Sequence, residues 1–164
     1  MKRIIITALL VLSLLTGCLQ ANDPTAEENY FTVALIVRAD ILLDNMHLLD
    51  REKHELVPAD GVIFPEATVK AFEGESVFDV LRREMRQAGI HMAFRITPIL
   101  NSAYIEAINN LYEFDAGDLS GWLYMVNGEF PGVGASQHIL APGDVIEWVF
   151  TLDLGRDAGG FESW

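Results

Sequence analysis

The sequence predicts an α+β domain in which one helix lies across a mixed sheet. Residues 76–89 have the apolar spacing and the end signals of an amphipathic helix. Short β-rich runs separated by turn residues surround this stretch on both sides. A helix buries an apolar stripe and a sheet buries an apolar face, so the expected arrangement packs one on the other.

The first strand is expected at residues 31–37, where β-branched and other apolar residues follow one another. Residues 40–66 are less regular and contain several turn residues, among them Pro65. We therefore expect a long ordered excursion there, with one helical turn near residues 45–49. A second strand is expected at residues 68–72.

The helix has the most specific signals. Ser76 can cap its first turn, and Asp79 three residues later completes a capping-box pattern. Gly89 lies where a helix commonly ends in a left-handed conformation. An apolar stripe is expected to face the sheet, and three arginines are expected to face solvent near the negative end of the helix. The stripe is Val77, Leu81, Met85 and Ala88, with Phe78 beside it, and the arginines are Arg82, Arg83 and Arg86.

Downstream, strand signals recur between turns. Asn127-Gly128 directly follows one apolar run, which is typical of a tight hairpin because both turn residues must adopt positive φ. The β segments are expected at residues 91–97, 103–108, 122–126 and 145–151. The last of them places Ile146, Trp148 and Phe150 on one side.

The N-terminus predicts export. Lys2 and Arg3 precede an apolar run at residues 4–15, which is shorter than the roughly 20 residues that span a bilayer. Residues 15–18, Leu-Thr-Gly-Cys, resemble a bacterial lipobox, so we expect cleavage before Cys18 and lipid on its thiol. An ordinary secretory signal with a chance cysteine is the alternative. The expected organisation is a lipoprotein signal peptide at 1–17, a lipidated flexible tether at 18–30, a folded domain at 31–157 and a C-terminal tail at 158–164.

Composition excludes some partners. The chain has 11 basic and 24 acidic residues and a net charge of −13. Loss of Lys2 and Arg3 with the signal peptide leaves nine basic residues and a charge near −15. Nucleic acid is disfavoured because phosphate binding requires a basic face, and an anionic lipid surface would repel the body. Cys18 is the only cysteine, so no internal disulfide can form.

The sequence gives little support for catalysis. It contains no H-E-x-x-H, G-x-S-x-G or phosphate-cradling glycine motif, and its four histidines are scattered. Asp115 and Asp118 suggest calcium, but their spacing misses the order of an EF-hand loop. Turn-forming aspartates are the stronger interpretation. We therefore expect a non-enzymatic protein without a specific metal site.

Aromatic residues and glycines gather at residues 121–136. Trp122, Tyr124 and Phe130 offer flat apolar surface, and four glycines leave backbone groups accessible, which suits a flat ligand. The alternative is a packed hairpin with Trp122 in the core. Alternation places Trp122, Tyr124 and Val126 on one face of the strand, and Leu123 and Met125 on the other.

Several segments carry a resemblance to a known family. They lie at residues 44–46, 57–63, 74–81 (GESVFDVL), 104–106, 108–113, 121–128 (GWLYMVNG) and 143–148. They resemble the bacterial family catalogued as domain of unknown function 4430, over a stretch from about residue 33 to residue 155. That family is similar to the C-terminal β-domain of transcobalamin and intrinsic factor, the animal cobalamin carriers. The resemblance implies a β-grasp-like fold for residues 31–157.

The resemblance also implies a ligand and a site. In the carriers this domain closes over the corrin ring while a helical domain covers the other face. A cobalamin-like corrinoid is therefore the expected ligand, and no other cofactor is expected. The positions that can be carried over lie on the predicted hairpin and the loop after it. The expected ligand-binding residues are Trp122, Tyr124, Asn127, Phe130, Val133, Gly134, Ala135 and Ser136.

These expectations describe an extracytoplasmic lipoprotein, held on a bacterial membrane through Cys18, that captures a corrinoid or another small molecule for uptake. Because half of a carrier covers one face of the ligand, a membrane transport component is the expected partner. Two alternatives stay open, namely a cell-surface module for adhesion or assembly that contacts protein or glycan, and a metal-binding protein. A concave pocket beside Trp122 would favour a small ligand, and a flat apolar patch would favour a partner.

Overall fold

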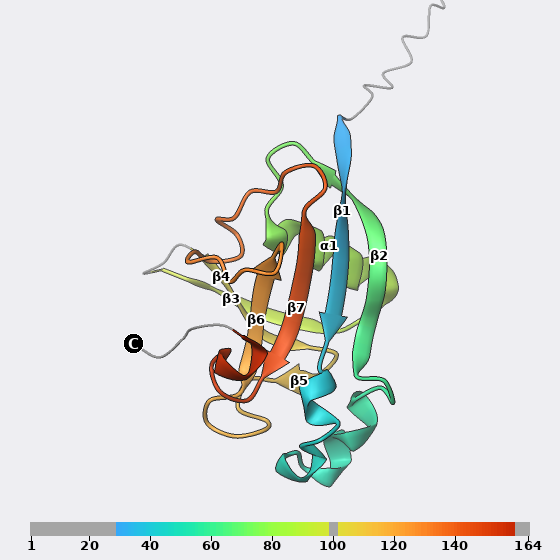
Figure 1. The fold of residues 1–164 in the computed structure, drawn as a ribbon, viewed down its shortest axis with the longest axis vertical. Helices are drawn as coiled ribbons and strands as arrows, with labels where there is room; N and C mark the ends of the chain where they lie inside the picture. The colour runs from blue at the N-terminus through green and yellow to red at the C-terminus, as the bar shows by residue number, and fades with distance from the viewer. Residues whose placement is uncertain (1–28, 99–101, 160–164) are drawn as a thin grey trace, which may run out of the picture.

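A computed structural model of the chain describes residues 29–98 and 102–159 (Figure 1). The predicted signal peptide, Cys18, the tether up to residue 28 and the tail from residue 160 lie outside the described residues. Within the described residues, no helix is long and apolar enough to cross a membrane. The strands are β1 (Tyr30–Arg38), β2 (Val62–Phe72), β3 (Met92–Thr97), β4 (Ser102–Ile108), β5 (Leu111–Tyr112), β6 (Gly121–Val126) and β7 (Val145–Thr151). The helices are α1 (Val77–Ala88) and the 3₁₀ segments η1 (Asp40–Leu42), η2 (Met46–Leu48), η3 (Arg51–Leu56) and η4 (Arg156–Ala158).

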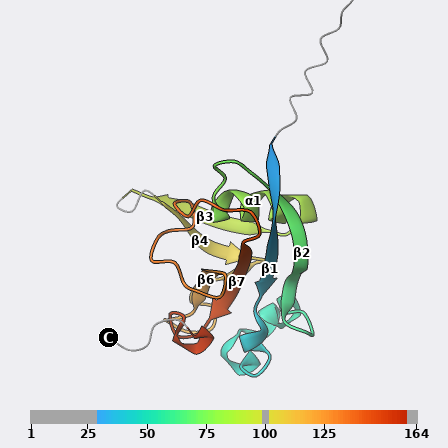
Figure 2. The ribbon, with the colours of Figure 1, turned by 45° about the horizontal axis from the view of Figure 1, so that its top comes forward.

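The strands form two sheets. A four-stranded sheet has the order β2-β1-β7-β6, with β1 parallel to β7 and the other pairs antiparallel. An antiparallel three-stranded sheet has the order β3-β4-β5. Figures 1 and 2 show α1 and the β3–β4 ribbon on the same side of the larger sheet. The predicted α+β class, with a mixed sheet and one main helix, is confirmed, and the separation into two sheets is a feature that the pattern did not predict.

The core lies between the larger sheet and these covering elements. Alternate residues of β1 and β7 are buried in it, including the predicted trio Ile146, Trp148 and Phe150. The predicted helix stripe is buried at Val77, Leu81 and Met85, but Ala88 is exposed and Val80 is buried in addition. The stripe therefore ends one turn before the end of the helix.

β2 is longer than predicted. It begins at Val62, six residues before the expected start, so the irregular excursion is correspondingly shorter. Pro65 misled the prediction because proline cannot donate to a ladder hydrogen bond. Proline is tolerated here because β2 is an edge strand and the register skips between the pairs Leu35–Ala67 and Val37–Phe64, where two residues of β2 stand against one of β1.

The excursion contains three 3₁₀ helices where one helical turn was predicted. η2 coincides with that turn, whereas η1 and η3 were not predicted. Such short helices lack the 3.6-residue apolar spacing that reveals an α-helix in a sequence. Leu42 and Leu49 are buried and attach this stretch to the core.

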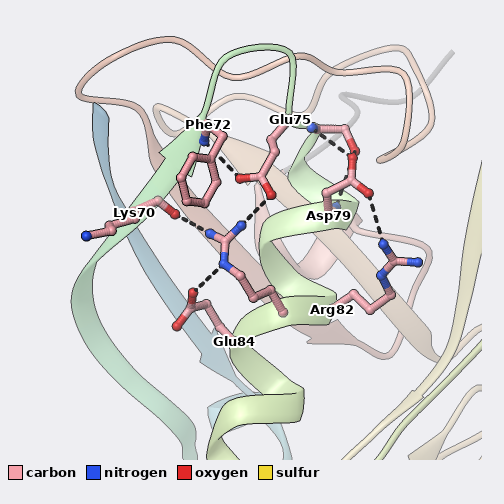
Figure 3. A network of polar contacts seen from close by, with 8 residues as sticks. Lys70, Phe72, Glu75, Asp79, Arg82 and Glu84 are labelled. Atoms are coloured by element: carbon pink, nitrogen blue, oxygen red, sulfur yellow. Dashed lines mark hydrogen bonds and ion pairs between the residues drawn. The ribbon is translucent and has the colours of Figure 1, made fainter. Parts of the chain in front are cut away.

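The ends of α1 are as predicted. The Ser76 Oγ accepts from the Asp79 N–H, and the Asp79 carboxylate accepts from the Ser76 N–H, so the capping box is complete (Figure 3). Gly89 follows the helix with a φ of 69°, the left-handed conformation that its position indicated.

Arg83 does not point to solvent as predicted. Its guanidinium donates to the carboxylates of Glu75 and Glu84 and to the backbone carbonyl of Lys70 (Figure 3). The side chain therefore ties α1 to the end of β2. The other two arginines of the helix are exposed, in agreement with the prediction.

The turn at Asn127-Gly128 forms, but the predicted hairpin does not. Both residues have positive φ, 55° and 81°, and Val126 and Glu129 exchange backbone hydrogen bonds of 2.9 and 3.1 Å across the turn. Pairing stops at this single bridge, since the following residues include Pro131 and two glycines, which disfavour a strand. β6 pairs with β7 instead.

Candidate functional site

A cavity of about 170 Å³ lies beside β6. Its walls come from β4, β6, β7 and the loop at residues 130–135, so it lies where the two sheets meet that loop. Six of the eight predicted ligand-binding residues line it: Trp122, Tyr124, Phe130, Val133, Gly134 and Ala135. The other lining residues are Ala103, Tyr104, Ile105, Leu123, Pro131 and Trp148.

Three aromatic residues of the larger sheet form the inner wall of this cavity. Trp122, Tyr124 and Trp148 are 6%, 8% and 2% exposed, respectively. The Tyr124 and Trp148 rings lie 5.3 Å apart, and the Trp122 ring meets Phe150 edge to face at 5.2 Å. Trp122 is thus a core residue that also borders the cavity, and these rings do not form an open platform for a flat ligand.

The Tyr124 hydroxyl holds the opposite wall in place. It donates a hydrogen bond of 2.8 Å to the backbone carbonyl of Val133, which lies on the loop. Burial raises the pKa of Tyr124 to about 12, because the phenolate would lose its hydration. The hydroxyl therefore remains a neutral donor at physiological pH.

Gly134 brings the loop against β4. A Cβ at this position would lie 1.8 Å from the Ser102 Oγ and 2.4 Å from the Ser102 Cβ, which only glycine avoids. Beside it, the Ser136 Oγ accepts from the Ala103 N–H at 3.0 Å and lies 3.1 Å from the Ser102 Oγ. Gly134 and Ser136 thus position the wall of the cavity.

The loop is also bonded to the helix. The Val77 N–H donates to the carbonyl of His138 at 3.0 Å, and the Phe78 N–H donates to the carbonyl of Ala135 at 3.1 Å. These are two of the first-turn amides that a helix cannot satisfy internally. The cavity wall and the start of α1 therefore share their hydrogen bonds.

Two of the predicted binding residues have other roles. Asn127 lies away from the cavity, where its side chain donates to Asp144 at 2.9 Å and accepts from the Val145 N–H at 3.0 Å. It fastens the tight turn to the start of β7. Ser136 does not line the cavity, and its hydroxyl contacts β4 as described above.

The size of the cavity limits what can enter it. An apolar cavity of about 150 Å³ holds one benzene molecule, whereas pockets for drug-sized ligands measure about 300–1,000 Å³. A volume of about 170 Å³ therefore accepts a single ring or one side group of a larger molecule. A whole corrin ring is too large for it.

All the residues that line this cavity lie in a segment that matches the model of a known protein family. Residues 74–151 match the family model described as a domain of unknown function (DUF4430). The resemblance to this family that the motifs indicated is confirmed. The DUF4430 match begins after β2 and ends in β7, so β1 and β2, which complete the larger sheet, precede it.

Solved structures also resemble the chain, and two of them are described here. The crystal structure of haptocorrin in complex with Cbi (cobinamide) aligns with a TM-score of 0.55 and 16% sequence identity, over 76% of this chain and 25% of the haptocorrin chain. The chain thus spans a quarter of haptocorrin, and the likeness shows a shared fold of the transcobalamin type. A protein from Ruminococcus gnavus ATCC 29149, named for a proposed metal-binding role, aligns with a TM-score of 0.44 and 13% identity over 74% of this chain and 96% of its own. A comparison with curated proteins found no match.

The rim of the cavity in the DUF4430 segment includes Tyr104, which the sequence did not indicate. Its hydroxyl donates to Glu113, and burial followed by this hydrogen bond raises the pKa of Tyr104 to about 12. The guanidinium of Arg95 lies 4.3 Å from the centre of the Tyr104 ring and pairs with Glu106 and Glu113. This arrangement leaves the rim polar, with two carboxylates against one guanidinium.

β4 contributes another wall of the cavity, and the alternation of buried and exposed residues along 103–108 is the sequence signal for its inward face. Ala103 and Ile105 are buried on one side of the strand, and Tyr104 lies partly exposed on the other. The sequence predicted a strand at residues 103–108. It did not predict that this strand would lie across the cavity from β6 and β7.

The candidate calcium site does not assemble. The Asp115 carboxylate pairs with Lys53 and accepts from the Tyr112 N–H at 2.8 Å, as a turn-forming aspartate does, while Asp118 is exposed. Across residues 29–98 and 102–159, no three His, Cys, Asp or Glu side chains converge as metal ligands would.

Proposed function

We propose that this protein is a non-enzymatic small-molecule-binding protein whose binding site is the cavity beside β6. The observation that carries the proposal is that six of the eight residues selected from the sequence line one concave site. Concavity beside Trp122 is the feature that favours a small ligand over a flat protein contact. Tyr104 and Tyr124 are the titratable residues on this wall, and both remain protonated at neutral pH, so they support binding better than acid–base catalysis.

A corrinoid is the proposed ligand class, on a fold of the β-grasp type. This part of the proposal is supported by the DUF4430 match and by the fold shared with haptocorrin, which was crystallised with Cbi. The cavity would receive one peripheral group of the corrinoid, and its larger part would remain outside. A membrane transport component is the proposed partner for that part.

Calorimetric titration tests corrinoid binding. Residues 22–164 contain every described element, so this body is titrated with cobinamide and with cobalamin. We expect saturable heat with one of them and a weaker response after Val133→Asp, which places a charge at the exposed rim. Gly132→Ala, which has open space around it, is the matched control. Absence of heat at millimolar ligand would overturn corrinoid binding by this protein alone.

The proposed location is extracytoplasmic, with lipid on Cys18 as the anchor to a bacterial membrane. Its support is the sequence of residues 1–18. Cys18→Ala is expected to release the protein into the soluble fraction or leave it uncleaved, because the lipid acceptor is lost. Fractionation followed by immunoblotting measures this outcome. Cleaved C18A protein retained in the membrane at the wild-type level would contradict the proposal.

The second candidate function is a module that contacts a protein or a glycan at the cell surface. An exposed apolar patch favours it, formed by Phe114, Leu119 and Leu154. Backbone hydrogen bonds join Phe114 to Ser120 and Leu154 to Leu119, and both Phe114 and Leu154 have positive φ. Bulky residues in this conformation are uncommon, and strained backbone of this kind is more frequent at functional sites than elsewhere.

A further inference from the structure

A second pocket, of about 420 Å³, lies at the end of the domain where β1 begins. Three segments line it, residues 29–31, 73–74 and 139–142, and together they form what we call the entry surface. Figures 1 and 2 show the start of β1, the turn between β2 and α1 and the loop that leads into β7 at this same end. The pocket shares no lining residue with the cavity beside β6, so it is a separate feature of the domain.

Backbone hydrogen bonds hold the three segments of the entry surface together. The Leu140 N–H donates to the carbonyl of Glu75 at 3.0 Å, and the Gly143 N–H donates to the carbonyl of Thr32 at 2.9 Å. The loop into β7 is therefore bonded both to the turn before α1 and to β1. The pocket is built by the fold itself, so a partner would not have to order it on binding.

The rim of this pocket exposes apolar side chains. Tyr30 and Ile139 are 53% and 55% exposed, respectively. The Lys70 Nζ lies 4.0 Å from the centre of the Tyr30 ring. A tyrosine ring beside a long-stemmed lysine suits a membrane–water interface, where the ring lies at the level of the headgroups and the ammonium group extends to water. Glu73 adds one negative charge to the lining, so the surface carries charges of both signs.

The position of this surface in the chain indicates what covers it. Asn29, which lines the pocket, lies eleven positions after Cys18. Even fully extended, eleven residues span at most about 40 Å. Lipid on Cys18 would therefore keep the entry surface near the bilayer at a high effective concentration, where a weak contact becomes populated. Because the charge near −15 disfavours an anionic surface, an uncharged lipid surface fits best.

We propose that the entry surface is a membrane-contact surface, which rests on the bilayer that holds Cys18 and places Tyr30 and Ile139 among the lipid headgroups. This inference rests on the proposed location, because lipid on Cys18 brings the bilayer to this end of the domain. It adds a second contact with the same membrane. That contact fixes the orientation of the domain, so the cavity beside β6 is presented to a membrane component in one direction.

A fluorescent label on the lipidated full-length protein tests this contact. Cys18 is the only native cysteine and its thiol carries the lipid, so an introduced cysteine is the only free thiol. Ile139→Cys and Leu48→Cys are each labelled with the fluorophore NBD and reconstituted into phosphatidylcholine vesicles. Leu48 is the matched control because it is 42% exposed and lies at the opposite end of the domain (Figure 1). We expect the label at position 139 to shift its emission to the blue and to be quenched by nitroxide lipids, and the label at position 48 to behave as in water.

Two substitutions measure the contribution of the apolar rim. Tyr30→Asp, made in the protein labelled at position 139, replaces an apolar contact with a charge, whereas Leu43→Asp makes an equivalent change at an exposed leucine near the control position. Y30D is expected to lower the ratio of membrane-docked to undocked protein by about fivefold to tenfold, as the quenched fraction measures. L43D is expected to leave that ratio unchanged.

The proposal is overturned if the labels at positions 139 and 48 respond alike, or if Y30D keeps the wild-type ratio. A blue shift at position 139 without quenching by nitroxide lipids also overturns it, because protein rather than lipid would then cover the pocket. Should Y30D fail to fold, the two labels on the otherwise unchanged protein decide.

Mass spectrometry of the purified protein separates this inference from the proposed anchor. Cys18 without lipid would remove both the anchor and the membrane contact. Lipidated protein that shows no response at position 139 would remove the membrane contact alone and leave the anchor in place. The calorimetric titration with corrinoids concerns the cavity beside β6, so its outcome is independent of both.

Discussion

Replacing Gly134 with alanine is expected to lower the free energy of unfolding by about 1–3 kcal/mol, the usual effect of forcing extra atoms into a packed site. The new Cβ would lie 1.8 Å from the Ser102 Oγ, so either the loop or β4 must move. Because the same loop forms a wall of the cavity, ligand binding should weaken as well. Urea denaturation of the variant and the wild type measures the loss of stability.

Gly132→Ala is the matched control, since it lies in the same loop and its added Cβ would meet no atom within 4 Å. This change should leave stability within about 0.5 kcal/mol of the wild type. Adding Ser102→Gly to the Gly134→Ala variant removes the clashing side chain and should restore part of the loss. An unchanged stability in Gly134→Ala would show that the loop does not approach β4 as described.

Raising the pH from 9 to 12 is expected to destabilise the protein through Tyr124. Burial raises the pKa of its hydroxyl to about 12, while in the unfolded chain the pKa is near 10. Between pH 10 and pH 12 the native state therefore keeps a proton that the unfolded state has lost. The contribution of Tyr124 to the free energy of unfolding is complete below pH 10 and is lost as the pH rises towards 12. Its size is roughly 2–3 kcal/mol, from the free energy that corresponds to two pKa units. Urea denaturation at several pH values gives the slope.

Tyr124→Phe isolates this contribution. At pH 7 the variant should be about 1 kcal/mol less stable, because the carbonyl of Val133 loses its donor. Above pH 10 it should lose stability more slowly than the wild type. Tyr104→Phe is a useful comparison, since the Tyr104 ring is partly exposed and should contribute less. Parallel pH profiles for the wild type and Y124F would contradict the role assigned to burial.

The elements that sequence predicted best are those with local causes. Ser76, Asp79 and Gly89 lie within one helix and its caps, so their roles follow from their spacing. The tight turn at Asn127-Gly128 was predicted for the same reason. The pairing of β6 with β7 was not predicted. The two strands are separated by an 18-residue connection, and local sequence signals do not indicate pairing over that separation.

The site was predicted in part for related reasons. The residues between Trp122 and Ala135 are close in sequence, so a cluster of aromatic residues and glycines identified them together. For Trp148 the sequence predicted only a shared side of the last strand with Ile146 and Phe150, because its place at the cavity depends on the pairing of β6 with β7. Arg83 was expected to face solvent and Pro65 to lie outside a strand. Both predictions failed because helix periodicity and β propensity do not show that β2 is an edge strand beside the helix.

The hydrogen bonds from the first turn of α1 to the carbonyls of Ala135 and His138 make the loop and the helix one cooperative unit. Displacing the loop to admit a ligand would expose the N–H groups of Val77 and Phe78 to solvent. The rate of hydrogen–deuterium exchange at these two amides therefore reports how often the loop wall of the cavity opens, although neither Val77 nor Phe78 lines the cavity. Sequence changes at the helix start can in this way alter how often the cavity opens, without any contact with the molecule that enters it.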